Sequence, residues 1–334
     1  MSKISIYVKI LHLPGFAALA MPAVIGAISV GVFDFYSLVL LLCIGGFAVI
    51  YGFILNDYSD VELDRLVPEL RKKPLVSGEI GMKTGITISL ILIMLTFLFI
   101  FFLWWGKEIN DTKLLSVLLL FFAGILGSIY NIYGKQIVGS DFLVAIALGF
   151  LFLFGALSVG IPTPITWIIF WLTFNQTLHM NAVEGGIKDI DHDFKMGVKN
   201  IALKSGVKLK DKKLTIPAGF KAFGLGIRLT SAILLFLPFF IFNYSYEIWH
   251  LFILAIATII MLFYSYKLIT LKEFNRNKIQ RFIGIQSFLR YSCVPIMLIT
   301  IIDIKIVIFL IFFPLLWYVI LTILIKETLF KPRM

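Results

Sequence analysis

Ten apolar runs, each of about 20 residues, follow one another along this chain, separated by segments that carry most of its charge. A helix of about 20 apolar residues is long enough to cross the hydrocarbon core of a bilayer. The sequence is 60% hydrophobic and 15% charged, whereas soluble domains carry nearer a quarter charged residues. The pattern therefore predicts an integral membrane protein.

The expected fold is all-α: a polytopic transmembrane helical bundle of nine to ten spans, with a central cavity that opens to the cytoplasmic side. Helices are favoured because they satisfy their own backbone hydrogen bonds in lipid. We expect one transmembrane domain over residues 1–334. Its predicted spans cover residues 10–31, 37–56, 84–105, 113–131, 141–160, 163–184, 223–243, 249–270, 281–301 and 304–325.

Basic residues are distributed unevenly between the two sides that these spans define. With the N-terminus in the cytoplasm, only Lys107, Lys113 and Lys305 face outward, and the other 27 of the 30 basic residues lie inside or at inner span ends. Because basic loops stay on the cytoplasmic side, we predict a multi-pass protein of the cell membrane with its active site on the cytoplasmic face. The net charge of +11 has the same explanation, so no nucleic-acid partner is expected.

Two acidic clusters end apolar runs, and both fall on the predicted cytoplasmic face. The first contains Asp57, Asp60 and Asp64, and the second contains Asp189 and Asp193. Spacings of three and four residues place carboxylates on one helix face, where like charges repel. A divalent cation removes that repulsion, and Mg²⁺ typically binds one or two carboxylates together with substrate phosphate oxygens. We expect Asp57 and Asp193 to be accessible to solvent.

A basic stretch follows each acidic cluster. The first stretch is Arg71-Lys72-Lys73, and the second runs from Lys195 to Lys213. Carboxylates that hold a metal, followed by cations that bind phosphate, are typical of a diphosphate site.

Three segments resemble signatures of the UbiA superfamily of intramembrane prenyltransferases. The first runs from Asn56 to Asp64 and continues as Lys73-Pro74-Leu75-x-Ser77-Gly78; the second runs from Lys188 to Gly197; the third is Tyr130-Asn131-Ile132-Tyr133-Gly134-Lys135. They cover the chain from span two to the loop after span six, in the family's order. One departure is at the first span, where the family often has an Arg-Pro-like pair and this chain has Leu11-His12-Leu13-Pro14.

The resemblance implies Mg²⁺-dependent transfer of a polyprenyl group from an isoprenyl diphosphate donor to a hydrophobic acceptor, among membrane lipid. It implies that the catalytic, metal-binding residues are Asp57, Asp60, Asp64, Asp189 and Asp193. It implies that the diphosphate is bound by Asn56, Arg71, Lys73, Lys135 and Lys199.

Four polar side chains interrupt the predicted sixth span: Asn175, Gln176, His179 and Asn181. Polar residues inside a membrane line a cavity or form hydrogen bonds between helices. We place Asn175 and His179 in the acceptor or prenyl pocket, together with Tyr130, and keep interhelical hydrogen bonding as the alternative. Glu184 and Lys188 stand four residues apart, and we expect them to pair with each other.

The acceptor has two candidate classes: an aromatic ring, and a polar lipid headgroup. The second would make this an archaeal-type enzyme of ether-lipid synthesis, which transfers geranylgeranyl to a glycerol phosphate lipid. A function from another class is cation-coupled transport across the membrane. Transport predicts carboxylates near the middle of spans, whereas both acidic clusters here stand at predicted inner span ends.

Overall fold

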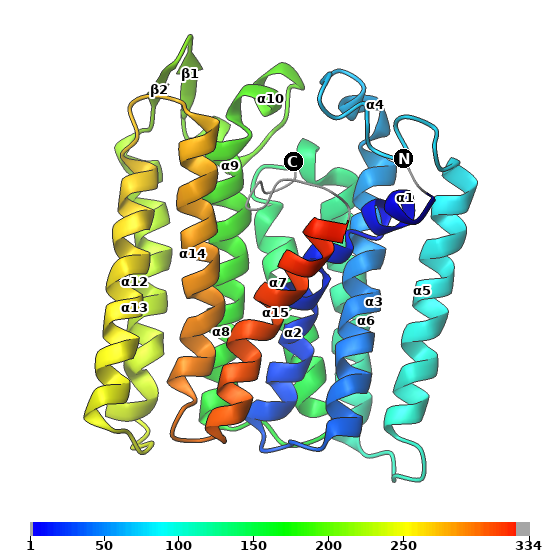
Figure 1. Cartoon of the computed structure of the whole chain (residues 1–334), viewed down its shortest axis with the longest axis vertical. Helices are drawn as coiled ribbons and strands as arrows, with labels where there is room; N and C mark the ends of the chain where they lie inside the picture. Colours follow the sequence, from blue (N-terminus) through cyan, green and yellow to red (C-terminus); the bar gives the residue numbers. More distant parts are fainter. Residues whose placement is uncertain (1–2, 325–334) are drawn as a thin grey trace. The chain divides into compact units, whose positions relative to one another are not determined.

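The computed structural model describes residues 3–324, most of which are helical (Figure 1). Within this range a helix stands at each predicted span: α2 (Leu13–Ser29), α3 (Phe35–Ser59), α5 (Met82–Leu103), α6 (Asp111–Tyr133), α7 (Asp141–Leu157), α8 (Pro164–Leu178), α12 (Ala218–Phe240), α13 (Ile248–Ile269), α14 (Arg276–Met297) and α15 (Ile304–Leu324). The all-α expectation is confirmed. The last residue of the predicted tenth span, position 325, lies outside the described residues.

Six helices of the described chain are long and apolar enough to cross a membrane: α3, α5, α6, α12, α13 and α15. Helices α2 and α7 are apolar but shorter. These helices indicate a multi-pass membrane protein. The count of nine to ten spans and the cavity that opens to the cytoplasmic side remain predictions.

Short elements occupy the connections between the long helices. They are α1 (Lys3–Ile10), α4 (Val61–Asp64), the 3₁₀ turn η1 (Gly134–Gln136), the π-helical segment η2 (His179–Gly185), α9 (Gly186–Lys188), α10 (Ile190–Lys195), α11 (Ile201–Lys204), β1 (Lys208–Lys210) and β2 (Lys213–Thr215). Strands β1 and β2 pair antiparallel with Leu209 opposite Leu214. The second basic stretch therefore ends in a hairpin that the sequence analysis does not predict.

The described chain divides into two compact units. The expectation of one transmembrane domain over the whole chain stays a prediction. The first unit comprises residues 3–134, 146–170 and 317–324, and the second comprises residues 135–145 and 171–316. The first acidic cluster belongs to the first unit, and the second acidic cluster belongs to the second unit.

Small residues bring helices of the first unit close together. Helix α3 packs against α2, α5 and α6. A Cβ atom at Gly45 of α3 would lie 2.7 Å from the Ala20 carbonyl oxygen, and one at Gly155 of α7 would lie 1.9 Å from the Ala23 carbonyl oxygen. Membrane helices commonly pack through such small residues, because lipid provides no hydrophobic force between helices.

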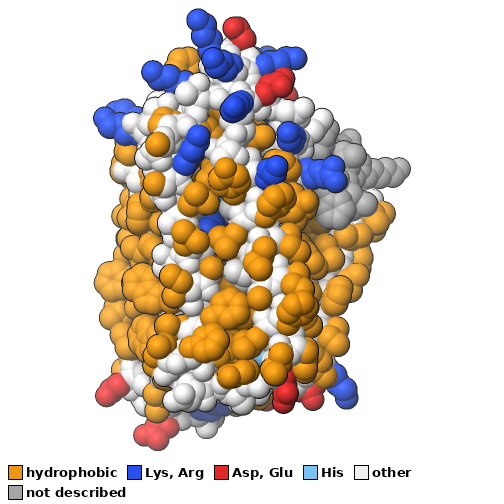
Figure 2. Space-filling model, turned by 90° about the vertical axis from the view of Figure 1, so that its left-hand side faces the viewer, with side chains coloured by type: hydrophobic (Ala, Val, Ile, Leu, Met, Phe, Trp, Pro, Cys, Tyr) orange, Lys and Arg blue, Asp and Glu red, His pale blue; other side chains and the backbone are white. Residues whose placement is uncertain are grey.

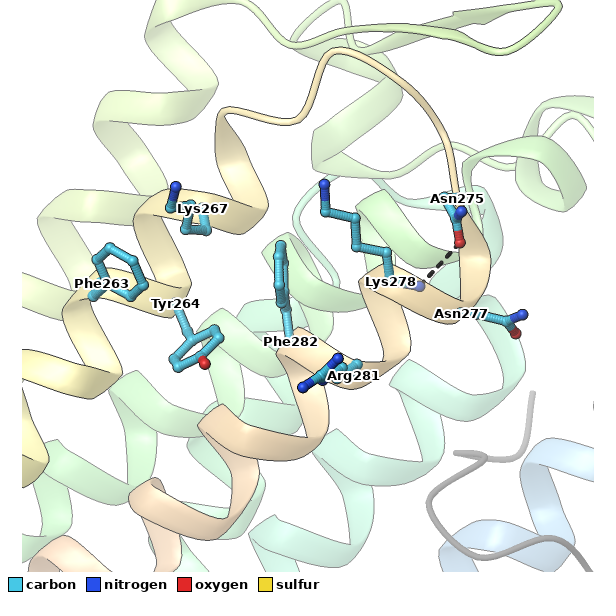
Figure 3. A pocket seen from close by; sticks show the side chains of 8 residues that line it. All are labelled: Phe263, Tyr264, Lys267, Asn275, Asn277, Lys278, Arg281 and Phe282. Carbon is cyan, nitrogen blue, oxygen red and sulfur yellow. Dashed lines mark hydrogen bonds between the residues drawn. The ribbon is translucent and has the colours of Figure 1, made fainter.

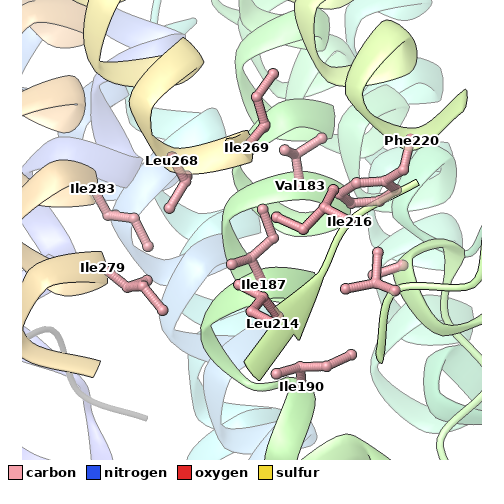
Figure 4. Packing of buried hydrophobic residues seen from close by; sticks show 12 residues of the cluster. Val183, Ile187, Ile190, Leu214, Ile216, Phe220, Leu268, Ile269, Ile279 and Ile283 are labelled. Carbon is pink, nitrogen blue, oxygen red and sulfur yellow. The ribbon is translucent and has the colours of Figure 1, made fainter. Parts of the chain in front are cut away.

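The second unit has a hydrophobic core beneath the connection that carries its acidic cluster. Figure 4 shows this packing, in which Ile187 and Ile190 contact residues from other elements. The labelled residues are Val183, Ile187, Ile190, Leu214, Ile216, Phe220, Leu268, Ile269, Ile279 and Ile283. Ile187 is 0% exposed and Ile190 is 1% exposed. Because these two isoleucines flank Asp189, their burial fixes the backbone that presents that carboxylate.

Hydrophobic side chains also cover outward surfaces. Figure 2 shows them over the middle of one face, over α12 and α13, with Lys and Arg side chains gathered at one end. This distribution is the one expected of helices in lipid with charged residues at their ends. Two basic residues differ from the sequence prediction, because Arg228 and Arg290 are buried within α12 and α14 rather than placed at inner span ends.

Candidate functional site

The first acidic cluster lies where α3 ends and α4 begins. The Asp60 N–H donates to the Asn56 carbonyl at 2.9 Å, and the Asp64 N–H donates to the Asp60 carbonyl at 2.8 Å. The helical hydrogen-bond pattern thus continues through the cluster. Asp57, Asp60 and Asp64 are 3%, 6% and 1% exposed. The expectation that Asp57 is solvent-accessible is therefore wrong, because the chain after α4 folds back onto it.

Lys73 is the residue that returns to the cluster. Its Nζ lies 3.0 Å from Asp57 Oδ1 and 2.7 Å from Asp64 Oδ2. Burial alone would lower the pKa of Lys73, but the charges of Asp57 and Asp64 outweigh burial and raise that pKa above its ordinary value. Two carboxylates of the cluster therefore converge on one positive charge.

The segment after Lys73 explains how its ammonium reaches the acids. Leu75 is buried in a hydrophobic cluster with Ile54 and Ile80. The Ser77 N–H donates to the Lys73 carbonyl at 2.9 Å, and the Ile80 N–H donates to the Pro74 carbonyl at 3.0 Å. Gly78 adopts a φ of 78°, a left-handed conformation that costs glycine little. The Lys-Pro-Leu-x-Ser-Gly sequence is thus an anchored turn.

His12 is a second partner of the first cluster. Its Nε2 lies 2.8 Å from Asp57 Oδ2, and its ring stacks on Phe53 with ring centroids 4.6 Å apart. His12 directly precedes α2, at the position where the UbiA superfamily often has the Arg-Pro-like pair described above. The Arg71 Nε donates to the Arg65 carbonyl at 2.9 Å, and the predicted role of Arg71 at the diphosphate stays a prediction. Asn56 is half-buried at the end of α3.

The second acidic cluster follows an irregular end of the sixth predicted span. Helix α8 passes into the π-helical segment η2, then α9, and Asp189 stands between α9 and α10. The Asp193 N–H donates to the Asp189 carbonyl at 2.9 Å, and Asp193 Oδ2 accepts from Asn200 Nδ2 at 2.7 Å. Burial, followed by the charge of Asp189, raises the pKa of Asp193 to about 7 against the opposing charge of Lys135.

Gly197 and Lys199 connect this cluster to a basic segment. Gly197 has a φ of 66°, and the Val198 N–H then donates to the Asp193 carbonyl at 2.9 Å. A glycine in the left-handed region commonly ends a helix in this way. The Lys199 N–H donates to the Lys135 carbonyl at 2.8 Å. The second unit therefore brings together Asp193, Lys135 and Lys199, which the sequence predicts for one site.

The other two aspartates of this segment differ in their partners. Asp189 Oδ2 lies 3.2 Å from Lys188 Nζ. Asp189 Oδ1 is buried, has no hydrogen-bond partner in the described chain, and lies 3.8 Å from Arg276 Nη1. Asp191 accepts from Arg276 Nη2 at 2.6 Å. Arg276 begins α14 and is a cation of this site that sequence reasoning missed, because 85 residues separate it from Asp191.

The predicted pocket residues lie inside helices. Asn175 is 8% exposed in α8, and Tyr130 is half-buried in α6. His179 is 0% exposed, and neither of its ring nitrogens has a hydrogen-bond partner among the described residues. Its Nδ1 lies 3.4 Å from Glu184 Oε1. The structure thus places His179 beside a buried carboxylate.

Glu184 is the centre of a charged network that the sequence analysis did not predict. Arg228 Nη2 donates to Glu184 Oε1 at 2.8 Å, and Arg290 Nη1 donates to Glu184 Oε2 at 3.0 Å. All three side chains are 4% exposed or less. The expected pair of Glu184 with Lys188 is wrong, because the π-helical turn directs Glu184 towards α12 and α14. The sequence contained one sign of this network: two arginines lie inside apolar runs, and a charged residue there requires a buried partner.

The side chains of both clusters fit Mg²⁺ in their chemistry. No group of three or more His, Cys, Asp or Glu side chains converges as a metal site within residues 3–324. However, Asp57 and Asp64 already converge on one cation, and Asp189 presents a buried oxygen without a hydrogen-bond partner in the same described range. Carboxylate oxygens are the protein ligands that Mg²⁺ prefers.

Comparison of sequences identifies relatives that match slightly less than half of the chain. The 4-hydroxybenzoate octaprenyltransferase of Vesicomyosocius okutanii subsp. Calyptogena okutanii (strain HA) is 27% identical over 158 residues, which is 46% of this chain and 52% of the relative. The enzyme of the same name from Francisella tularensis subsp. novicida (strain U112) is 27% identical over 160 residues, or 47% of this chain and 52% of the relative. The chain thus spans about half the length of the curated relatives it matches.

Solved structures share the fold at low sequence identity. A UbiA homolog from Archaeoglobus fulgidus bound to GPP and Mg²⁺ has a TM-score of 0.61 and 18% identity, and the match covers 87% of this chain and 99% of that one. A structure of digeranylgeranylglyceryl phosphate synthase has a TM-score of 0.60 and 22% identity, with 96% and 98% coverage. Residues 16–288 match the profile of the UbiA prenyltransferase family. Because this match covers most of the sequence, the chain belongs to the UbiA prenyltransferase family.

Proposed function

We propose that this protein transfers a polyprenyl group from an isoprenyl diphosphate to a hydrophobic acceptor within the membrane, in a reaction that depends on Mg²⁺. The observation that carries the proposal is the convergence of Asp57 and Asp64 on the single positive charge of Lys73. Family membership supports it, and so does the A. fulgidus homolog, which shares the fold and binds GPP and Mg²⁺.

We assign metal binding to both acidic clusters and propose that they serve one cavity on the cytoplasmic face. The proposed ligands are Asp57, Asp60, Asp64, Asp189 and Asp193. When bound, Mg²⁺ would stabilise the negative charge that the diphosphate gains as it leaves. The buried carboxylates of the first cluster, Asp57, Asp60 and Asp64, suit this task, because their negative charge is costly to keep in a site without a matching cation.

Lys73 has two positions in this proposal. Without substrate, its ammonium neutralises Asp57 and Asp64, as the 3.0 Å and 2.7 Å contacts indicate. When the metal–diphosphate complex binds, Lys73 gives up this place and its ammonium donates to the diphosphate. Lys135 and Lys199 supply further positive charge beside the second cluster, and Asn56 contributes an amide at the first. We also propose Arg71 as a diphosphate ligand, which requires its guanidinium to move away from the Arg65 carbonyl when the diphosphate binds.

The protein lowers the barrier of this reaction mainly by electrostatic stabilisation of the leaving group. The allylic C–O bond of the donor breaks, and the electron pair leaves with the diphosphate. The acceptor attacks the resulting allylic cation and then loses the proton from the attacking atom, which the released diphosphate or water accepts. Fixed charges aimed at the leaving group lower the barrier, because they need no reorganisation during bond cleavage. We propose Tyr130 and Asn175 as residues of the acceptor or prenyl pocket, with the fully buried His179 as part of its wall.

Two acceptor classes are compatible with this chemistry. The sequence relatives are named 4-hydroxybenzoate octaprenyltransferases, which favours an aromatic acceptor. The digeranylgeranylglyceryl phosphate synthase structure covers nearly the whole chain, and its name favours a glycerol phosphate lipid acceptor. We propose one of these two classes, and the assay below distinguishes them.

Cation-coupled transport is less compatible with the buried charges. The one carboxylate within the predicted sixth span, Glu184, is held by Arg228 and Arg290. Two arginines outweigh the charge of one glutamate, so this site would repel a cation. The carboxylates that converge on a cation, Asp57 and Asp64, stand instead at the end of α3 and in α4.

The proposal is tested by transfer assays on the full chain purified in lipid nanodiscs. The protein is incubated with labelled geranylgeranyl diphosphate and Mg²⁺, with either 4-hydroxybenzoate or geranylgeranylglyceryl phosphate, and products are identified by mass. We expect one acceptor to gain a geranylgeranyl group while diphosphate is released. A second donor, octaprenyl diphosphate, controls for chain length. Absence of any prenylated product with both donors and both acceptors would contradict the proposal.

A further inference from the structure

A pocket with a volume of about 650 Å³ lies between the facing ends of α13 and α14, within the second unit. Figure 3 shows its lining, in which Phe282 stands between Lys267 and Lys278. Its cations and aromatic rings are Lys267, Lys278, Arg281, Phe263, Tyr264 and Phe282. This pocket is separate in sequence from the acidic clusters and has no role in the proposed reaction.

The three cations of the pocket have no acidic partner within residues 3–324. In the described part of the chain, Lys267, Lys278 and Arg281 form no ion pair with Asp or Glu. Lys267 Nζ lies 5.2 Å from the ring centroid of Phe263, and Lys278 Nζ lies 5.9 Å from that of Phe282. Aromatic faces attract cations, so these contacts hold two of the positive charges at the pocket without neutralising them.

The first turn of α14 adds to the positive potential. Asn275 caps this helix, because its side chain accepts from the Lys278 N–H at 3.0 Å. A second asparagine, Asn277, also lines the pocket. The N-terminus of a helix carries partial positive charge that favours anions. Here it reinforces three unpaired cations around a cavity, and the combination selects a negatively charged ligand.

An exposed apolar strip leads away from the pocket along α13. Phe252, Ile256, Ile259 and Phe263 recur at intervals of four, three and four residues, and all four are exposed. Residues at such intervals share one helix face, and Lys267 extends the same face by four residues. The surface is therefore apolar along its length and cationic at one end. Figure 2 shows the same polarity on a face of the protein, with hydrophobic side chains beside a basic end.

We propose that this pocket binds the phosphate headgroup of an anionic membrane phospholipid, whose acyl chains lie along the apolar strip. The cations match the negative charge of the headgroup, and the apolar strip that follows them matches the acyl chains. A free phosphate ion would match the cations but not the strip, and a zwitterionic lipid would place its own positive charge near Lys267, Lys278 and Arg281.

A lipid bound at this position would also act on the second acidic cluster through the first turn of α14. Arg276, in the first turn of α14, donates to Asp191, and Asn277 and Lys278 of the same turn line the pocket. A bound headgroup would hold this turn in place and with it the Arg276 guanidinium. The binding itself requires no prenyl transfer, so it stands or fails independently of the proposed function.

The test compares lipid retention by three forms of the full chain. The pocket variant carries Lys267→Gln, Lys278→Gln and Arg281→Gln. The matched control carries Lys208→Gln, Lys210→Gln and Lys212→Gln, which removes the same number of charges from exposed positions of the hairpin. Each form is titrated in detergent with phosphatidylglycerol or phosphatidylcholine, and bound lipid is counted by native mass spectrometry. Inorganic phosphate is added separately as a competitor.

We expect wild type and the hairpin control to bind one phosphatidylglycerol with similar affinity and to prefer it over phosphatidylcholine. The pocket variant should lose on the order of 100-fold in affinity, since each basic residue near a headgroup contributes about fivefold. Equal losses in the two variants would overturn the proposal in favour of diffuse attraction. Equal binding of phosphatidylcholine, or displacement by millimolar inorganic phosphate, would also overturn it. Unchanged thermal stability of the pocket variant excludes misfolding as the cause of its loss.

Discussion

Lys73 Nζ lies 2.7 Å from Asp64 Oδ2 and shares its charge with Asp57, at 3.0 Å. The protein thus contains a cation of its own between two carboxylates that we assign to metal binding. This arrangement has a physical reason: Asp57 and Asp64 are almost fully buried, and paired buried carboxylates without a cation are costly. We therefore propose that metal and ammonium compete for one position.

Replacement of Lys73 with Gln should separate two properties. Because the competing ammonium is gone, the Mg²⁺ concentration for half-maximal activity should fall. Because a donor to the diphosphate is gone, kcat/KM for the isoprenyl diphosphate should fall by roughly 10-fold to 100-fold. Both quantities come from transfer rates measured across Mg²⁺ and donor concentrations. Lys72→Gln is the matched control, since Lys72 is exposed. A higher half-maximal Mg²⁺ concentration for Lys73→Gln than for wild type would contradict the competition.

Asp57→Asn and Asp193→Asn should each reduce transfer by on the order of 100-fold or more, because each removes a proposed metal ligand. Asp191→Asn is the control within the same acidic segment, because Asp191 is bound to Arg276; its rate should fall only a few-fold. Initial rates at saturating Mg²⁺ measure all three. An Asp193→Asn enzyme with wild-type turnover would remove this residue from the metal site.

Chelation should abolish activity, and the choice of ion should decide its recovery. After EDTA treatment and exchange into chelator-free buffer, Mg²⁺ or Mn²⁺ should restore transfer. Ca²⁺ should restore it poorly, because it prefers longer bonds and more ligands than Mg²⁺. Product formation with each ion is the measurement. Full turnover in excess EDTA would show that the acidic clusters act without a metal.

Glu184→Gln should destabilise the second unit, because it leaves Arg228 and Arg290 buried without a counter-charge. Breaking a buried pair in this way costs about 3–5 kcal/mol, so the thermal unfolding midpoint in detergent should fall clearly. Arg65→Gln is the control: it removes the exposed pair of Arg65 with Glu62, and exposed pairs contribute about 0–1 kcal/mol. Similar midpoints for the two variants would show that the network contributes little to stability.

The helical fold and the positions of its long helices follow from the sequence, because apolar run length is a direct requirement of the bilayer. The acidic clusters were recognisable in the sequence, since carboxylates beside apolar runs are rare; their role as one metal site stays a prediction. The family resemblance correctly identified the UbiA prenyltransferase family, which the match over residues 16–288 confirms.

Tertiary contacts account for what the sequence did not predict. The burial of Asp57 depends on the anchored turn at Leu75 and Gly78, which brings Lys73 back over 16 residues. The partners of Glu184 depend on a π-helical turn, whereas the expected pairing with Lys188 assumed regular helix geometry. Arg276 approaches Asp191 only because α14 begins beside α10. Such contacts between distant segments leave no local pattern in the chain.

We propose that the two acidic clusters form one diphosphate site, and a double-mutant cycle measures whether they act on the same bound group. The affinity for a non-reacting thiolodiphosphate analogue of the donor is measured by calorimetry in Mg²⁺ for wild type, Asp57→Asn, Asp193→Asn and the double variant. If both residues act on the same bound group, each single variant should lose nearly as much affinity as the double variant, because coupled residues are not additive. Losses that add in free energy, or wild-type affinity in either single variant, would contradict one shared site.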